Sequence, residues 1–275
     1  MPWALGPPDG RYMFRQPAGV SGSAPGHVLV LATLGAPERR RGLAQRRRRK
    51  AEPEPEPSAV ATGRVTVIDV AAPLPGAGDA QSWLAQAGED ELAAGLAVLN
   101  QALHAFRQVT ADPSVHPVTR RQLLVARIGY GAGEQVADGL WTDALELLPA
   151  VGRETRSKVL HPQARLAAVL NRREPALVCE ELVLRARSDL DHGRDREAAL
   201  QLLVALDAAL AELAGTSSIA DLGQRLAELR AQRDPAAIAA QAALSGPLSA
   251  AHRETVAFAV GRIEAALRAR AVANA

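Results

Sequence analysis

Few residues of this chain have the types and spacing that catalysis or metal binding requires. The single cysteine, Cys179, is followed by Glu180 and Glu181. Neighbouring carboxylates raise the pKa of a thiol, which weakens it as a nucleophile, so we expect a buried structural thiol. The histidines are isolated from one another and never form His-x-x-x-His or Glu-x-x-His; they are His27, His104, His116, His161, His192 and His252. This pattern predicts no zinc site.

The densest polar cluster is Asp189, Asp191, His192 and Asp195. These side chains are of metal-binding type, but the intervening Gly193-Arg194 does not have the spacing of a calcium loop, and solvation of a helix end explains the cluster better. The sequence also lacks Gly-x-Ser-x-Gly and any paired-carboxylate signature. We therefore predict no catalytic residue, no metal and no cofactor, although catalytic groups converge in space and not in sequence.

A glycine-rich run extends from Gly129 to Glu134. It contains Gly-x-Gly-x-Gly, but it has neither the spacing of a dinucleotide-binding fingerprint nor a following P-loop lysine. We interpret its glycines as a site of close helix packing or a kink. The alternative, a loop that cradles an anion, is opposed by the charge of Glu134. Tyr130, Glu134 and Trp141 form the candidate partner surface, and an enzyme of unknown class with a site near Glu134 and Trp141 stays a third hypothesis.

One segment carries the basic character of the chain. Residues 38–56 hold seven arginines and one lysine against four glutamates, a net charge of +4, whereas the whole chain is +2 and the remainder is therefore −2. The Glu-Pro repeat favours polyproline II, and the arginine blocks repel one another, so we predict a disordered loop over residues 36–60. Phosphate contact is the alternative to simple solvation, through Arg39, Arg40, Arg41, Arg46, Arg47, Arg48, Arg49 and Lys50. Since no aromatic residues are interleaved for base stacking, such contact with nucleic acid or anionic lipid would be non-specific.

The composition favours a helical protein. Hydrophobic residues make up 48% of the 275 residues but aromatic ones only 3%, so the core must be aliphatic, which favours helix packing over a β-sandwich. The use of arginine in place of lysine, together with much alanine, is typical of a high-GC bacterial genome. A lone cysteine suits a reducing cytoplasm. We identify no signal peptide, and the most apolar run, Val28–Leu34, is too short to span a bilayer.

Short β-rich runs occupy the N-terminal part. Arg11–Arg15 alternates polar and apolar residues, and His27–Leu34 and Arg64–Val70 are apolar runs of strand length bounded by Pro, Gly and Ser. We predict a small antiparallel sheet that helices must cover, in a β subdomain over residues 1–75.

From residue 76 onward the hydrophobic period is helical, which predicts an α-helical domain over residues 76–275. About nine helices are expected, and helical patterns occur over residues 80–87, 89–107, 119–137, 153–160, 162–172, 175–191, 195–213, 219–233, 235–246 and 247–271. The segment Asp195–Leu213 is apolar nearly all round and should lie at the centre of the helical packing. A charge at Leu203 or Leu206 should unfold it.

Two turns resemble those of the tetratricopeptide repeat family. Gly139-Leu-Trp-Thr-Asp-Ala-Leu145 has the Gly, aromatic and Ala-Leu order of a repeat's turn and second helix. Gly193–Leu200 is similar, with Ala198, Leu202 and Ala205 at small, large and small positions. The resemblance covers residues 119–150 and 175–213 and implies helical hairpins that bind proteins.

The chain departs from that family in its spacing. Ala144 and Ala198 are 54 residues apart, whereas tandem repeats recur about every 34 residues. The sequence thus predicts a mainly α protein with a small N-terminal antiparallel sheet. We expect a non-enzymatic, cytoplasmic interaction or scaffold protein that binds a protein partner or a second copy, and a nucleic-acid or anionic-surface binder is the main alternative.

Overall fold

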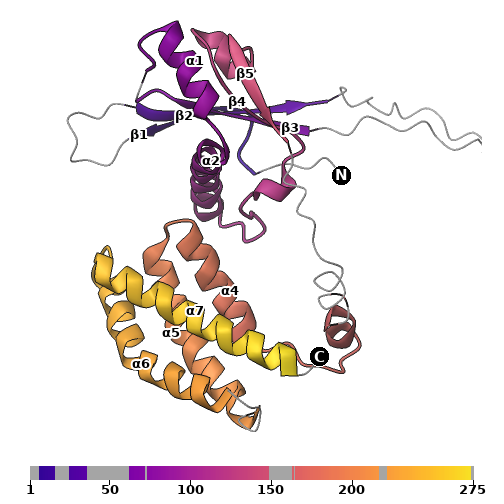
Figure 1. The fold of residues 1–275 in the computed structure, drawn as a ribbon, viewed down its shortest axis with the longest axis vertical. Coiled ribbons are helices and arrows are strands. Elements are labelled where there is room, and N and C mark those ends of the chain that lie inside the picture. Colours follow the sequence, from indigo (N-terminus) through magenta and orange to yellow (C-terminus); the bar gives the residue numbers. More distant parts are fainter. Residues whose placement is uncertain are drawn as a thin grey trace, which may run out of the picture. The chain divides into compact units, whose positions relative to one another are not determined.

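The computed structural model describes residues 6–15, 25–35, 62–71, 73–148, 163, 165–216 and 222–273. Contacts divide the chain into two compact units, Met1–Val151 and Gly152–Ala275, which Figure 1 draws in indigo to magenta and in orange to yellow. The sequence predicts the boundary near residue 75, whereas these contacts join the two helices that follow the sheet to the first unit. The predicted loop at residues 36–60 lies outside the described residues.

The first unit contains the predicted three-stranded sheet. Its strands are β1 (Gly10–Arg15), β2 (Pro25–Leu34) and β3 (Thr62–Asp69), antiparallel in the order β1-β2-β3. Because Met13 pairs with Val28 and Val28 with Ile68, alternate residues of the three strands share a face. The predicted combination of a mainly α fold with a small antiparallel sheet near the N-terminus is confirmed.

Helices and a second hairpin cover this sheet. Helix α2 (Glu89–Thr110) lies on one face, and α1 (Ala77–Gln86) and the hairpin of β4 (Ala126–Tyr130) and β5 (Asp143–Leu147) lie on the other (Figure 1). The α2 side holds a core of aliphatic side chains, formed by Leu29, Leu31, Leu99, Leu103, Val115 and Val118. The leucine stripe predicted for residues 89–107 supplies the helix's part of this core.

Asn100 is a buried polar residue of α2. Its side-chain amide forms hydrogen bonds with both the N–H and the carbonyl group of Val118, as a residue of a neighbouring strand would. Its Nδ2 donates to the Val118 carbonyl at 3.0 Å, and its Oδ1 accepts from the Val118 N–H at 2.7 Å. We expect Asn100→Leu to destabilise the first unit by about 2–4 kcal/mol, because both buried backbone groups lose their partners. Urea denaturation followed by tryptophan fluorescence checks this, and an unchanged midpoint would contradict it.

The helix predicted over residues 119–137 is wrong. This stretch forms the short 3-10 helix η1 (Arg120–Gln122), strand β4 (Ala126–Tyr130) and the 3-10 helix η2 (Glu134–Asp138), and β4 pairs with β5 (Asp143–Leu147). The helical hairpin predicted over residues 119–150 is therefore wrong over its described part, and Gly139–Leu145 leads into a strand. Glycines that disfavour helix and the β-rich Ala126–Tyr130 run explain the difference.

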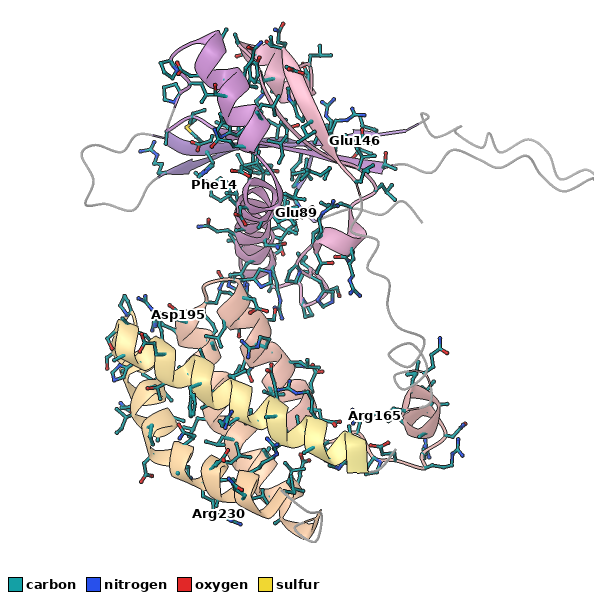
Figure 2. All side chains as sticks on the ribbon, viewed as in Figure 1. Phe14, Glu89, Glu146, Arg165, Asp195 and Arg230 are labelled. Atoms are coloured by element: carbon teal, nitrogen blue, oxygen red, sulfur yellow. The ribbon has the colours of Figure 1, made fainter. Side chains whose placement is uncertain are left out.

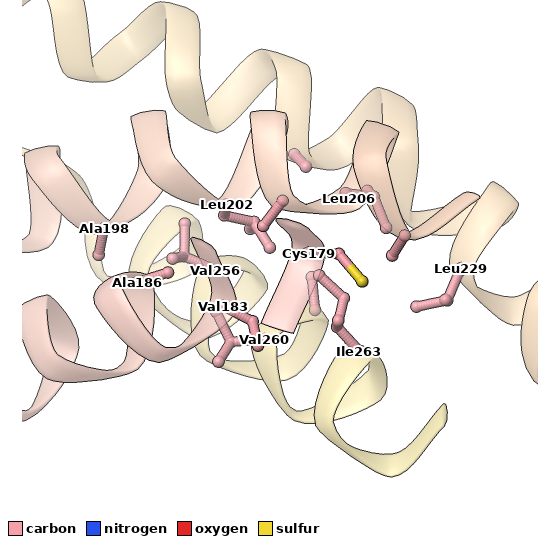
Figure 3. Close-up of a cluster of buried hydrophobic side chains, with 14 of the residues drawn as sticks. Cys179, Val183, Ala186, Ala198, Leu202, Leu206, Leu229, Val256, Val260 and Ile263 are labelled. Carbon is pink, nitrogen blue, oxygen red and sulfur yellow. The ribbon is translucent and has the colours of Figure 1, made fainter. Parts of the chain in front are cut away.

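The second unit is a bundle of α4 (Val178–Asp191), α5 (Asp195–Glu212), α6 (Leu222–Ser245) and α7 (Ala250–Ala273). Residues 165–170, ahead of them, are also helical, and the helix predicted over residues 153–160 lies outside the described residues. The predicted central helix, α5, contacts α4, α6 and α7. Figure 3 shows the core between them, a single cluster that includes Leu202 and Leu206 of α5 and Val256 and Ile263 of α7.

Helix α6 corrects another prediction. The sequence predicts separate helices before and after Asp234-Pro235, because proline interrupts the hydrogen-bond ladder, but α6 is a single helix with Pro235 inside it. Its buried residues continue on one face across the proline; they are Leu222, Leu226, Leu229, Ala236, Ala239, Ala240 and Ala243. Continuous burial of this stripe outweighs the one lost hydrogen bond.

Candidate functional site

The β4–β5 hairpin brings together the predicted partner-surface residues, and its glycines make this possible. A Cβ on Gly129 would lie 2.5 Å from the Trp141 ring and 2.6 Å from the Asp143 carbonyl oxygen. A Cβ on Gly131 would lie 2.8 Å from Val136. The Thr142 N–H donates to the Tyr130 carbonyl at 2.8 Å, which holds the two ends of the loop together. The glycines serve close packing, as predicted, but in a β-hairpin and not between helices.

Two arginines from the sheet hold η2 in place. Arg11 of β1 pairs with Glu134 at 3.1 Å. Arg64 of β3 donates to the Asp138 carbonyl at 2.5 Å and lies 3.4 Å from its carboxylate. Because one contact is at each end of η2, the loop is tied to both outer strands of the sheet. The Glu134 carboxylate is 85% exposed and already paired, whereas Tyr130 and Trp141 are half-buried.

The open end of the hairpin is apolar and exposed. The last pair of the ladder is Ala126 with Leu147, and next to it Val125 is 55% exposed and Leu148 79% exposed. Leu124 is 78% exposed. Arg120 fixes this end by donating to the Leu148 carbonyl at 2.9 Å. Three large aliphatic side chains are thus exposed to solvent, on a backbone that the Arg120 hydrogen bond fixes at Leu148.

A second cluster of functional groups lies at the N-terminus of α4. The Glu212 carboxylate, at the end of α5, accepts from the backbone N–H groups of Val178 and Cys179, each at 2.9 Å. It caps α4 across the hairpin, because these N–H groups have no partner within their own helix. Desolvation raises the pKa of Glu212, but the hydrogen bonds from the Cys179 backbone and thiol and from the Val178 N–H together outweigh it, so the pKa is lowered. Burial, followed by the hydrogen bond to Glu212, raises the pKa of Cys179 to about 12.

The expectation of a buried structural thiol is confirmed, because Cys179 is fully buried. At neutral pH a thiol with this pKa is protonated and is a poor nucleophile. Of the two adjacent carboxylates, Glu180 contributes to the raised pKa of Cys179, but Glu212 contributes more. That residue is far away in sequence and reaches Cys179 only through the α4–α5 hairpin.

Two arginines share two carboxylates beside this cap. Arg165 pairs with Glu174 at 3.3 Å and with Glu180; Figure 2 shows it on the short helix before α4. Arg270 of α7 lies 3.7 Å from Glu174 and 3.5 Å from Glu180. Its side chain is only 8% exposed. Glu180 also accepts from the Leu177 N–H at 3.1 Å, so the network continues into the helix backbone.

We expect Glu212→Gln to destabilise the helical unit by about 1–2 kcal/mol at pH 7, because the neutral amide caps α4 less strongly. The folded-state pKa of Glu212 is lowered, so the carboxylate stabilises the fold above its unfolded pKa, and this contribution is lost as the pH falls through the folded pKa. The stability difference between the two proteins should therefore shrink on acidification. Urea midpoints at several pH values measure it, and a pH-independent difference would contradict the assignment.

The polar residues at the α4–α5 turn form hydrogen bonds and ion pairs at the ends of the two helices. Asp189 accepts from Arg194 at 2.7 Å, and Asp195 lies 3.7 Å from Arg253. The His192 Nδ1 lies 2.6 Å from the Ser188 carbonyl oxygen. Within the described ranges, His, Cys, Asp and Glu form no group suited to a metal ion.

The structure treats the two predicted contact regions differently. Tyr130, Glu134 and Trp141 belong to one hairpin, with Tyr130 and Trp141 at its loop and Glu134 turned to Arg11. The proposed phosphate contacts, Arg39–Arg41 and Arg46–Lys50, lie outside the described residues. Sequence reasoning missed the carboxylate–arginine network, whose members are far apart in the chain and carry no local pattern.

Comparisons with family models, with curated proteins and with solved structures found no match. Among the helices that the structure describes, none combines the length and apolarity needed to cross a membrane.

Proposed function

We propose that this chain is a non-enzymatic interaction protein that binds a protein partner through the open end of its β4–β5 hairpin. The observation that carries the proposal is the exposure of Leu124, Val125 and Leu148 at the same end of the hairpin, next to the last ladder pair of Ala126 with Leu147. Grouped exposed aliphatic side chains commonly mark protein-binding surfaces, whereas single ones do not. The fixed backbone beneath them lowers the entropy lost on binding.

The neighbouring strand fits a protein partner. Asp143 to Glu146 of β5 are exposed, and β5 is an edge strand of its two-stranded sheet. The ion pair of Arg127 with Glu146, at 2.9 Å, places charges beside the apolar end. An apolar centre with a polar rim is the usual anatomy of a protein interface.

The α4–α5 hairpin supports the scaffold part of the proposal. Ala198, Leu202 and Ala205 are fully buried, as the small, large and small pattern of a tetratricopeptide-like second helix requires. This likeness concerns one hairpin, because Gly139–Leu145 is not helical. A cytoplasmic location, which suits the single thiol, belongs to the same proposal.

The test compares retention of a partner by variants of the full chain. Leu124→Ser with Leu148→Ser removes the apolar surface, and Val109→Ser is the matched control, since Val109 is 82% exposed on α2. Tagged proteins are purified from lysate after nuclease treatment, and bound proteins are quantified. We expect the amount of a co-purifying partner protein to fall at least about tenfold for the double variant, as when the main anchoring side chains of an interface are removed. The control should retain the partner. Equal retention by all three proteins would overturn the proposal.

The alternative function is non-specific binding to nucleic acid or an anionic surface through Arg39–Arg41 and Arg46–Lys50. It is favoured by the net charge of +4 on residues 38–56 in a chain whose remainder is −2, since arginine clusters neutralise phosphates well. Deletion of residues 39–57 should abolish salt-sensitive retention of RNA or DNA. Unchanged retention after the deletion would rule it out.

The enzyme hypothesis near Glu134 and Trp141 is weaker. The Glu134 carboxylate is paired with Arg11 and is 85% exposed, whereas catalytic groups are usually placed in a concave pocket.

A further inference from the structure

We propose that residues 165–173 form a strap that ion pairs hold against the start of α4, and that this strap opens while the α4–α7 bundle stays folded. The strap comprises the helical residues 165–170 and the turn that follows them. Its opening would be a conformational device built into the helical unit, independent of the hairpin surface proposed above.

The strap contributes little to the apolar core. Leu166 is 57% exposed and Leu170 is 73% exposed, and Val169, the third large aliphatic residue of the strap, is half-buried. The core cluster and the hydrophobic residues packed against it begin at Leu177. A segment with few buried apolar contacts lies at the low end of local stability.

The attachment of the strap is electrostatic. Arg165 pairs with Glu174 and Glu180, and the Arg165 side chain is 37% exposed. The Glu174 and Glu180 side chains are each 19% exposed. Partly buried ion pairs are screened less than exposed ones, but the solvent access of the guanidinium keeps these pairs sensitive to salt. A strap held in this way should respond to ionic strength, whereas the aliphatic core should not weaken.

Arg270 makes the release of Arg165 inexpensive. Removing one partner of a buried ion pair is usually strongly destabilising, because an uncompensated charge remains. Here Arg270 stays within 3.7 Å of Glu174 and 3.5 Å of Glu180, so both carboxylates keep a cation when Arg165 leaves. Glu174 and Glu180 thus each contact two arginines, Arg270 of the bundle, which stays in place, and Arg165 of the strap, which can be released.

The turn at the end of the strap has the geometry of a hinge. Arg172 has a φ of 57°, a left-handed conformation that is unfavourable for a non-glycine residue. The Arg173 N–H donates to the Ala168 carbonyl at 2.8 Å, and the Asn171 N–H to Ala167 at 3.0 Å. A helix as short as residues 165–170 is not stable alone in water. Release of Arg165 should therefore also break the hydrogen bonds of the Asn171 and Arg173 amides.

Hydrogen exchange on the full chain tests the proposal at 20 mM and 500 mM NaCl. The variant is Arg165→Ala, and the control is Arg185→Ala, which removes an exposed ion pair with Glu181 on α4. In the wild type and the control, the amides of residues 171–173 should exchange on the order of fivefold faster at high salt, as expected for loss of an ion pair. In Arg165→Ala they should exchange fast at both salt concentrations, with α5 unchanged throughout.

Two results would overturn the proposal. One is equal exchange of residues 171–173 in Arg165→Ala and the wild type at low salt, which would mean that the ion pairs do not hold the strap. The other is a parallel increase in α5, which would mean that the bundle opens as a whole. Trypsin cleavage after Arg172 and Arg173 gives a second readout, and it should follow the amide exchange.

Discussion

Leu206→Asp should unfold the helical unit. Leu206 is fully buried in α5, and α5 contacts three other helices, so the carboxylate would be enclosed by aliphatic side chains without a partner. Burying an unpaired charge destabilises by more than about 4 kcal/mol, a large part of the total of about 5–15 kcal/mol for a typical domain. Far-UV circular dichroism of the full chain should show loss of most of the cooperative helical transition.

The matched control is Val204→Asp, on the same helix two residues earlier. Val204 is 56% exposed, so its carboxylate would stay hydrated and the transition should persist. Leu203, named with Leu206 from sequence, is only half-buried, and we now expect a smaller effect there. Normal melting of Leu206→Asp would contradict the central position of α5.

Gly129→Ala should disrupt the β4–β5 hairpin. The added methyl group would lie 2.5 Å from the Trp141 ring and 2.6 Å from the Asp143 carbonyl oxygen. The ring could move, but the carbonyl belongs to the paired strand, so the two strands would have to separate. We expect a loss of about 3 kcal/mol or more, the upper range for overpacking, and a changed Trp141 fluorescence spectrum.

Gly95→Ala is the control for this substitution. Gly95 lies inside α2, and a Cβ there would meet nothing within 4 Å, so alanine should stabilise the helix by up to about 1 kcal/mol. Thermal melts of the two variants should therefore shift in opposite directions. A Gly129→Ala protein that melts like the wild type would show that the close contacts relax freely.

The regular parts of the fold were predictable because their hydrophobic periods are clear. The alternation in residues 11–15 and the leucine spacing of residues 89–107 led directly to β1 and α2. Around Gly129 the local signals conflicted, since apolar spacing suited a helix while the glycines did not. The glycines and the β-rich run favoured the strand, and the close approach of Trp141 to Gly129 is a tertiary contact that the apolar spacing alone does not indicate.

The apolar residues on all sides of α5 predicted its neighbours correctly but not the burial of every side chain. It predicted helices on several sides, which the structure confirms, but Leu200 and Val204 remain exposed at 39% and 56%. Apolar content tells how much surface a helix offers for packing and not how many neighbours the chain supplies. The Glu212 cap illustrates the same limit, because only the antiparallel return of α5 brings it to the start of α4.

The position of Cys179 gives the protein an internal reporter. The chain has one thiol; it is fully buried, and its pKa is raised to about 12. A maleimide or disulfide reagent can therefore reach the Cys179 thiol only when the bundle opens transiently around the start of α4. The modification rate of the unaltered protein measures how often the bundle opens, without any engineered label.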